Sequence, residues 1–275
     1  MIPNLPILKI LPLDHLILHE DHDLQRTLPL IEKLRAQGIL RNPPIVMPLK
    51  DGSGLHMVLD GANRVTSLKE MEFPHIVAQV VDPEDKNVLL QTWNHVVWGL
   101  DPGKLIGALE AVESIRLQKI DPQKSLAPPP SMPTLIRTPE GDVFLAHTPS
   151  GLTEKVKALH GIVNCYKGSA SLDRTSQTLI EGFRRIYSDL TALIVFPRFD
   201  IPSVMALAGS GSLLPAGITR FTVSPRALHL NYPLHELSSA KPAAYKEAYL
   251  SKWVEQRVVR KGVRYYSEPT FLFDE

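Results

Sequence analysis

Residues 55–71 read LHMVLDGANRVTSLKEM, and this stretch is the strongest local feature of the chain. The apolar run 55–59 predicts a buried strand, Asp60-Gly61 breaks it, and apolar residues then recur at helical spacing. The first N–H groups of such a helix have no partner inside it and lie at the positive end of its dipole. We therefore expect a strand–turn–helix unit that binds an anion at its turn.

The turn itself carries residue types that suit phosphate. Gly61 lets the backbone turn and approach a ligand closely. Arg64 lies in the first helical turn, where its guanidinium can donate paired hydrogen bonds to phosphate oxygens. The same residues also fit an ordinary helix start, with Asp60 as N-cap and Arg64 as a surface charge. Spacing alone leaves both interpretations open.

A carboxylate that could orient or deprotonate a hydroxyl stands at Glu20, next to His19, between an early strand and the first predicted helix. Acidic residues are also favoured near helix N-termini, so taken alone Glu20 is more simply a helix-entry residue. Trp93 and His95, followed by Trp98, could wall a small-ligand pocket, or they could pack as one face of a helix.

Two arginines in the second half of the chain could bind a carboxylate or a phosphate with both arms of the guanidinium. Arg220 ends the sequence Gly-Ile-Thr-Arg that begins at residue 217, and Arg226 follows in Pro-Arg-Ala-Leu, 225–228. The Gly-Ser-Gly-Ser stretch 209–212 lacks the G-x-x-x-x-G-K-[ST] pattern, so it is read as a loop and not as a P-loop.

The composition is that of an ordinary globular protein, with 44% hydrophobic and 21% charged residues. A net charge of +1 gives no field that would attract nucleic acid or membranes, and no 18-residue apolar stretch predicts a membrane span. The single cysteine, Cys165, excludes an intrachain disulfide and fits a reduced, cytoplasmic setting. His15, His19 and His22 lack zinc-ligand spacing, so no protein-built metal site is expected.

We expect an α+β protein of two domains. Residues 121–133, DPQKSLAPPPSMP, contain five prolines, which predicts a stiff linker. Residues 1–120 are accordingly predicted to form an N-terminal domain that folds by itself. Residues 134–275 are predicted to form a second domain that completes the substrate site, α+β by its order of elements and α/β-type in its alternation of helices and strands.

The apolar pattern predicts the further elements. Helices are expected over 24–37, 87–100, 104–117, 152–165, 175–187, 201–208 and 240–260. Strands are expected over 7–11, 16–18, 45–47, 55–59, 75–81, 135–137, 143–146, 190–196 and 218–223. The strands 45–47 and 55–59 are expected to form a hairpin around the turn at Asp51-Gly52, and 135–137 and 143–146 a second hairpin.

With these motifs in place, HEDHDLQRTLPLIEKLRAQGILRNPPIV (19–46) and HMVLDGANRVTSLKEMEFPHIVAQVVD (56–82) resemble the ParB/sulfiredoxin superfamily. That superfamily holds nucleotide phosphates on a strand–turn–helix with a Gly-x-x-Arg core, here Gly61-Ala62-Asn63-Arg64. Sulfiredoxins carry Cys-His between the Gly and the Arg, where this chain has Ala-Asn. Cys165 lies far outside the motif, so sulfiredoxin chemistry is not expected.

Within the superfamily, the chain is most similar to the free-serine kinases. The likeness rests on the His-Glu pair, on Gly-x-x-Arg-Asn-Pro-Pro-Ile at 38–45, on Asp-Gly-x-x-Arg, on Thr-Trp-x-His at 92–95 and on Gly-x-Thr-Arg at 217–220. Kinases of this family often have histidine where Asn63 stands. The resemblance is strong over 16–98 and thinner over 134–235.

The resemblance implies a kinase that transfers a phosphoryl group from ATP or ADP, with Mg²⁺, to the hydroxyl of free L-serine. It implies the following roles: catalytic Glu20 and Asp60; nucleotide-binding Gly61, Ala62, Asn63 and Arg64; serine-binding Trp93, His95, Thr219 and Arg220. Two rivals stay open, a kinase for another small hydroxyl compound and a ParB-like, nucleotide-gated regulator that binds DNA. The near-neutral charge and the lack of a helix-turn-helix signature disfavour the regulator.

Overall fold

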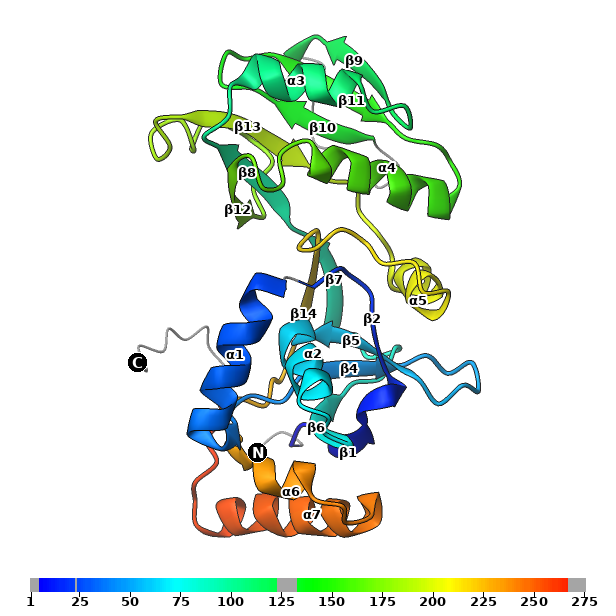
Figure 1. The fold of residues 1–275 in the computed structure, drawn as a ribbon, viewed down its shortest axis with the longest axis vertical. Coiled ribbons are helices and arrows are strands. Elements are labelled where there is room, and N and C mark those ends of the chain that lie inside the picture. The colour runs from blue at the N-terminus through cyan, green and yellow to red at the C-terminus, as the bar shows by residue number, and fades with distance from the viewer. Residues whose placement is uncertain (1–4, 23, 123–132, 267–275) are drawn as a thin grey trace.

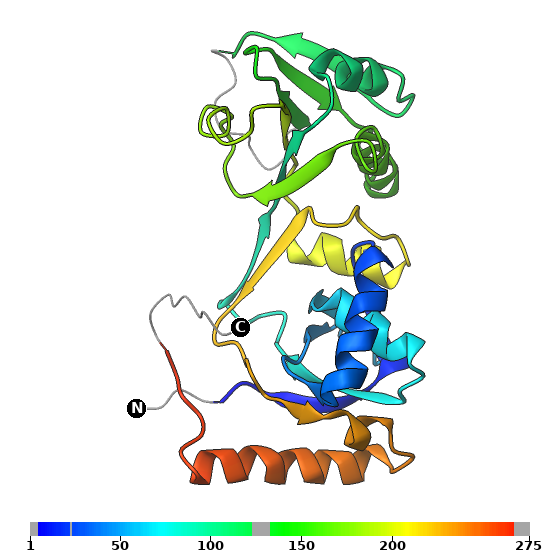
Figure 2. The same cartoon turned by 60° about the vertical axis from the view of Figure 1, so that its left-hand side comes forward.

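The computed structural model describes residues 5–22, 24–122 and 133–266. The chain forms a lower part, built on a mixed five-stranded sheet, and an upper part, built on a six-stranded antiparallel sheet (Figure 1). A two-stranded ribbon of β7 (Val88–Thr92) and β14 (Thr219–Val223) runs between them (Figure 2). This mixed architecture confirms the predicted α+β class.

The lower sheet has the strand order β1-β6-β4-β5-β2. Its elements are β1 (Leu8–Pro12), the 3₁₀ turn η1 (Leu13–His15), β2 (Leu16–Leu18), α1 (Leu24–Gln37), β4 (Ile45–Pro48), β5 (His56–Asp60), α2 (Ala62–Glu70) and β6 (His75–Val80). β4 and β5 form the predicted antiparallel hairpin, whereas β2–β5 and β4–β6 are parallel pairs. The strand–turn–helix expected at 55–71 is therefore present as β5, Gly61 and α2.

The C-terminal end of the chain completes the core of the lower part. α6 (Leu234–Ser238) and α7 (Ala243–Val259) lie beneath the sheet (Figure 1). Their buried Leu237 and Leu250 join one apolar cluster with Val65 and Leu68 of α2. A short pair of β15 (Tyr232–Pro233) with β3 (Ile39–Leu40) ties the same segment to the residues after α1.

The upper sheet has the strand order β12-β8-β13-β10-β11-β9, and every pairing in it is antiparallel. Its elements are β8 (Asn94–Trp98), α3 (Pro102–Glu110), β9 (Arg116–Ile120), β10 (Thr134–Arg137), β11 (Val143–His147), α4 (Leu152–Asn164), β12 (Ser171–Thr175) and β13 (Leu190–Val195). Apolar residues of α3 and α4 pack with one set of strand residues, and the turns around Ile180 and Phe183 pack with the alternate set. Because its strands pair antiparallel, this part is α+β as expected, and its α/β-type label is wrong.

The helix predicted over 87–100 is wrong, because this segment forms β7 and β8. β7 alternates buried and exposed residues, the period of a strand. β8 lies between β12 and β13, so four of its residues in succession are buried. An apolar run of this kind resembles a buried helix in sequence, and only strand pairing decides between them.

Two further predicted helices differ from the structure: one is shorter than expected and the other does not form. The helix predicted over 104–117 ends with α3 at Glu110; residues 111–115 lie outside any helix or strand, and the last two residues belong to β9. The segment 175–187 begins with the last residue of β12 and continues in turns instead of a helix. The remaining predicted helices and strands are present, with ends shifted by a few residues; α5 (Ile201–Gly209) is one of them.

The predicted domain boundary is also wrong. β8 and β9 precede residues 121–133 yet belong to the same sheet as β10, β11 and β13, and β9 pairs directly with β11. Residues 230–254 return to the core of the lower part. Most of the proline-rich stretch, 123–132, lies outside the described residues; it connects two strands of one sheet. The strands on either side of it, β9 and β10, belong to one sheet, so no domain boundary separates them.

Candidate active site

A cavity of about 750 Å³ opens where the lower sheet meets the β7–β14 ribbon. Its walls come from the ends of β2 and β5, the first turn of α2, and β14. The lining includes Glu20, Asp60, Gly61, Ala62, Asn63, Arg64, Trp93, Thr219 and Arg220, all predicted as site residues. It also includes His19, Asp21, His22, Arg174 and Arg226.

Gly61 sets the geometry of the turn between β5 and α2. Its φ is +98°, in the left-handed region that favours glycine. A Cβ at this position would lie 2.7 Å from Arg64 Nη2 and 2.9 Å from Pro44 Cβ. Gly61 is itself the N-cap residue, and no side chain caps the helix, so Asp60 is not the N-cap. The first N–H groups of α2 are thus left for another acceptor.

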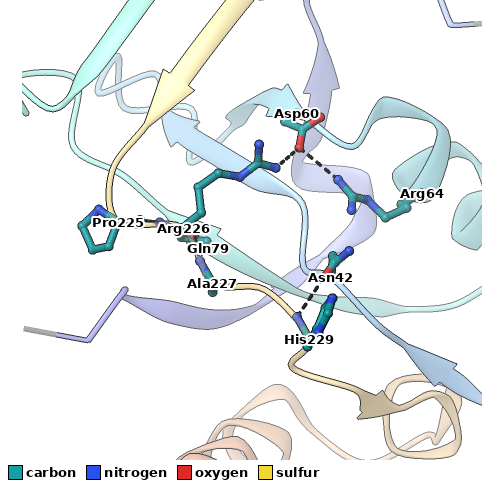
Figure 3. Close-up of polar contacts among 8 residues, drawn as sticks. All are labelled: Asn42, Asp60, Arg64, Gln79, Pro225, Arg226, Ala227 and His229. Carbon is teal, nitrogen blue, oxygen red and sulfur yellow. Dashed lines mark hydrogen bonds and ion pairs between the residues drawn. The ribbon is translucent and has the colours of Figure 1, made fainter. Parts of the chain in front are cut away.

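Asp60 instead accepts from two arginines through one oxygen, Oδ2 (Figure 3). Arg64 Nη2 lies 3.2 Å from it, and Arg226 makes a shorter contact from the far side. Burial lowers the pKa of Arg64, and the charge of Asp60 raises it in part. Two guanidinium groups facing one carboxylate leave the turn with a surplus positive charge, as an anion site requires.

Glu20 is held by the backbone at the start of β14. Its Oε1 accepts from the N–H groups of Ile218 (3.1 Å) and Thr219 (2.5 Å), and from the Thr219 hydroxyl (2.5 Å). Its Oε2 accepts from the N–H of Gly217 at 2.8 Å. Because Oε1 already serves three donors, Oε2 has the remaining capacity to accept from a substrate hydroxyl. The helix-entry interpretation of Glu20 is therefore wrong: its carboxylate bonds to residues almost 200 positions away.

A chain of hydrogen bonds extends from Glu20 to the buried His19. The Thr219 hydroxyl lies 2.7 Å from His19 Nε2, and His19 Nδ1 donates to the carbonyl of Val58 at 2.7 Å. The Thr219 hydroxyl carries one hydrogen, so it donates to only one of its two partners at a time, Glu20 Oε1 or His19 Nε2. His19 thus positions Thr219 beside Glu20.

Trp93 and Arg220 form one wall of the cavity as a stacked pair. The guanidinium carbon of Arg220 lies 4.4 Å from the centre of the Trp93 ring. The backbone N–H of Trp93 donates to the carbonyl of Ile218 at 3.0 Å, and this bond continues the β7–β14 pairing. Stacking leaves the N–H edge of the guanidinium available to a planar anion such as a carboxylate.

His95 is not among the residues that line this cavity, contrary to the prediction that it contacts the substrate. It is buried in β8, with Nδ1 2.8 Å from the Tyr166 hydroxyl and Nε2 3.0 Å from the Gly217 carbonyl. Burial lowers the pKa of His95 from 6.5 to about 4, so the ring is neutral near pH 7. His95 therefore supports the 217–219 backbone that holds Glu20.

Arg174 is the cavity residue for which the sequence carried no signal. It lies in β12, in a segment that was expected to lead into a helix. Its guanidinium covers Gly217 so closely that a Cβ there would lie 2.3 Å from it. Gly217, with φ +79°, thus allows both the turn and the approach of Arg174.

The described residues hold no cluster of three or more His, Cys, Asp or Glu side chains that could bind a metal ion. Glu20 and Asp60 are carboxylates of the cavity and could contribute single ligands to an ion that arrives with phosphate. Cys165 is a free thiol whose pKa is raised by burial, and it does not line the cavity. None of the helices built from the described residues is long and apolar enough to cross a bilayer.

Two relatives carry a named activity. The chain is 27% identical to the ATP-dependent L-serine kinase SbnI of Staphylococcus aureus, over 98% of this chain and 97% of the relative. It is 32% identical to an ATP-dependent L-serine kinase of Staphylothermus marinus over 110 residues, 40% of this chain and 42% of the relative. No family model matches the chain.

Solved structures agree with the sequence relatives. SbnI with a C-terminal truncation, from Staphylococcus aureus, superposes with a TM-score of 0.73 at 21% identity, covering 91% of this chain and 97% of that one. A free serine kinase in complex with AMP superposes with a TM-score of 0.68 at 18% identity, covering 84% and 93%. This chain has the fold of the free serine kinases. The expected likeness to those kinases is confirmed; membership of the ParB/sulfiredoxin superfamily stays a prediction.

Proposed function

We propose that this chain is a kinase that transfers a phosphoryl group from ATP to the hydroxyl of free L-serine, giving O-phospho-L-serine. One observation carries the proposal: the uncapped start of α2, a site suited to phosphate, and the Glu20 carboxylate, whose Oε2 can accept a further hydrogen bond, face one cavity. The named serine kinases that resemble the chain over its whole length or in part support the choice of substrate and donor. ADP remains the alternative donor, and the ParB/sulfiredoxin superfamily is the proposed ancestry of the lower part.

The polyphosphate of the nucleotide is proposed to bind the turn from Gly61 to Arg64, where helix N–H groups and guanidinium donors converge. Serine is proposed to bind on the opposite wall, with its carboxylate on Arg220 beside Trp93. Mg²⁺ bound to the phosphates would neutralise the charge that develops on them, and Asp60 is placed to contribute an oxygen ligand.

In the reaction, the serine oxygen forms a bond to the terminal phosphorus while the bond from that phosphorus to the bridging oxygen breaks. The hydroxyl proton passes to Oε2 of Glu20. Phosphoryl transfer needs positioning and charge neutralisation above all, and these are what the cavity walls offer.

The direct test is incubation of the purified chain with L-serine, Mg²⁺ and either ATP or ADP, followed by mass spectrometry for O-phosphoserine. D-Serine, L-threonine and L-homoserine in parallel test whether another small hydroxyl compound is preferred. Phosphoserine formed with ATP is the expected result. Salt-dependent DNA binding without any phosphorylated amino acid would instead support a nucleotide-gated regulator.

A further inference from the structure

The segment that follows β14 crosses the lower sheet and is fixed there by two amide side chains (Figure 3). Gln79, in β6, donates from Nε2 to the carbonyl of Pro225 and accepts at Oε1 from the N–H of Ala227, both at 2.8 Å. Asn42 accepts at Oδ1 from the N–H of His229 at 2.8 Å. We call residues 225–229 the strap.

The side-chain amide of Gln79 hydrogen-bonds the strap backbone on both sides of Arg226. Gln79 is only 3% exposed, and its donor and its acceptor are both used on strap backbone. A buried amide is tolerated where its hydrogen bonds are made, so this pairing fixes the backbone at residue 226. Neither bond involves the Arg226 side chain, which is free to exchange partners while its backbone stays fixed.

The side chain of Arg226 points from the strap to the turn from Gly61 to Arg64, the proposed phosphate site. It meets the same Oδ2 atom of Asp60 that Arg64 contacts from α2 (Figure 3). Arg226 and Asp60 are both part-exposed, at 39% and 43%, and both line the cavity with Gly61. One carboxylate cannot use the donors of two guanidinium groups, each of which carries five N–H bonds.

We propose that Arg226 is a phosphate-binding residue, delivered to the nucleotide site by the strap, and that Gln79 is its positioning residue. On binding, phosphate oxygens replace the Asp60 carboxylate as acceptors for Arg226, which joins Arg64 and the start of α2 around the polyphosphate. The inference rests on the proposed nucleotide site and adds to it a cation that lies 166 positions from Asp60 in the sequence. In the rival interpretation, the Arg226–Asp60 pair only docks the strap.

Calorimetric titration with ADP and with adenosine separates these interpretations. Arg226→Ala is expected to weaken ADP binding by about 10- to 100-fold, the scale of one lost charged hydrogen bond, and to leave adenosine binding unchanged within about twofold. Arg226→Lys, which keeps the charge without the planar fork, is expected to lie between. Arg116→Ala is the control, because it removes an exposed arginine of β9 that does not line the cavity; its ADP affinity should match wild type.

Gln79→Glu tests the positioning role, since a carboxylate can accept from Ala227 but cannot donate to Pro225. ADP binding should weaken by about 3- to 10-fold, and combining Gln79→Glu with Arg226→Ala should weaken it no further than Arg226→Ala alone. Fully additive losses would mean that Gln79 does not act through Arg226.

The outcomes also separate this inference from the proposed function. If wild type binds no ADP, the nucleotide site itself is wrong. If wild type binds ADP and both Arg226 variants bind it equally well, the strap does not supply a phosphate ligand and only this inference falls. Should Arg226→Ala fail to fold, the Arg226→Lys titration decides, because that variant can keep an ion pair with Asp60.

Discussion

Replacing Glu20 with glutamine tests the proposed proton transfer most directly. In Glu20→Gln the amide oxygen can take the place of Oε1 and keep its donors from Ile218 and Thr219. The amide nitrogen then faces the buried N–H of Gly217, where Oε2 was an acceptor. A buried N–H left without an acceptor costs about 1–3 kcal/mol, so the free energy of unfolding should fall by that amount.

The effect on catalysis should be larger than the effect on stability. An amide nitrogen cannot accept the serine proton, so turnover is expected to fall by at least ~10²-fold, the usual contribution of a positioned base. ADP affinity should change little, because the hydrogen bonds of the Glu20 carboxylate go to residues 217–219 and not to the turn from Gly61 to Arg64. Turnover is measured by phosphoserine formation at saturating serine, stability by urea denaturation, and affinity by calorimetry.

Asp21→Asn is the matched control, because it removes the same charge from the next residue. Asp21 lines the same cavity but pairs with His160, 3.7 Å away, and not with the 217–219 backbone. Its turnover should stay within about threefold of wild type, well below the effect of a lost catalytic base. If Glu20→Gln also stays within that range while folded, Glu20 is not the proton acceptor and the 217–219 contacts are only structural.

Four further predictions follow from the same structure. Arg64→Ala should weaken ADP binding by about 10- to 100-fold in calorimetry, through loss of a charged hydrogen bond at the helix start; unchanged affinity would mean that α2 faces no phosphate. Arg220→Ala should raise the KM for serine far more than that for ATP in steady-state assays, because it removes a substrate carboxylate partner; equal effects on both would contradict that role. A fragment of residues 1–120 should show no cooperative unfolding by circular dichroism, since β8, β9 and the first sheet all lose their packing partners; a cooperative transition would restore the boundary expected from sequence. His95 takes up a proton near pH 6.5 when unfolded and only near pH 4 when folded. The free energy of unfolding should therefore fall as the pH drops through that window, by up to ~3 kcal/mol; if a folded His95→Gln variant loses as much stability as wild type between pH 7 and pH 4.5 in urea denaturation, His95 is not the cause.

The turn from Gly61 to Arg64 is the part of the site whose geometry follows from the local sequence alone. A strand of apolar residues, a glycine and a helix are consecutive, so their geometry depends on local conformational preferences. Gly61 at φ +98° and the contact from Arg64 back to Asp60 both lie within one turn of chain. The β4–β5 hairpin around the turn is equally local, and it was predicted correctly.

The partners of this turn were decided only by the tertiary structure. Glu20 meets Thr219, and Asp60 meets Arg226, across 199 and 166 positions of sequence. No local period encodes such pairs, because they form only when β14 pairs with β7 and the strap docks on β6. Arg226 was noticed in the sequence as a possible anion ligand, yet nothing there placed it at the helix start.

The same reason explains the errors in the fold. Residues 88–98 are apolar enough for a buried helix or for two strands, and what decided was the presence of β12, β13 and β14 as partners. The prolines of 121–133 predict a linker, but whether a linker separates domains depends on which strands pair across it. Local preferences thus determined the turn that can hold phosphate. Hydrogen bonding between distant strands decided which carboxylate and which arginines face it.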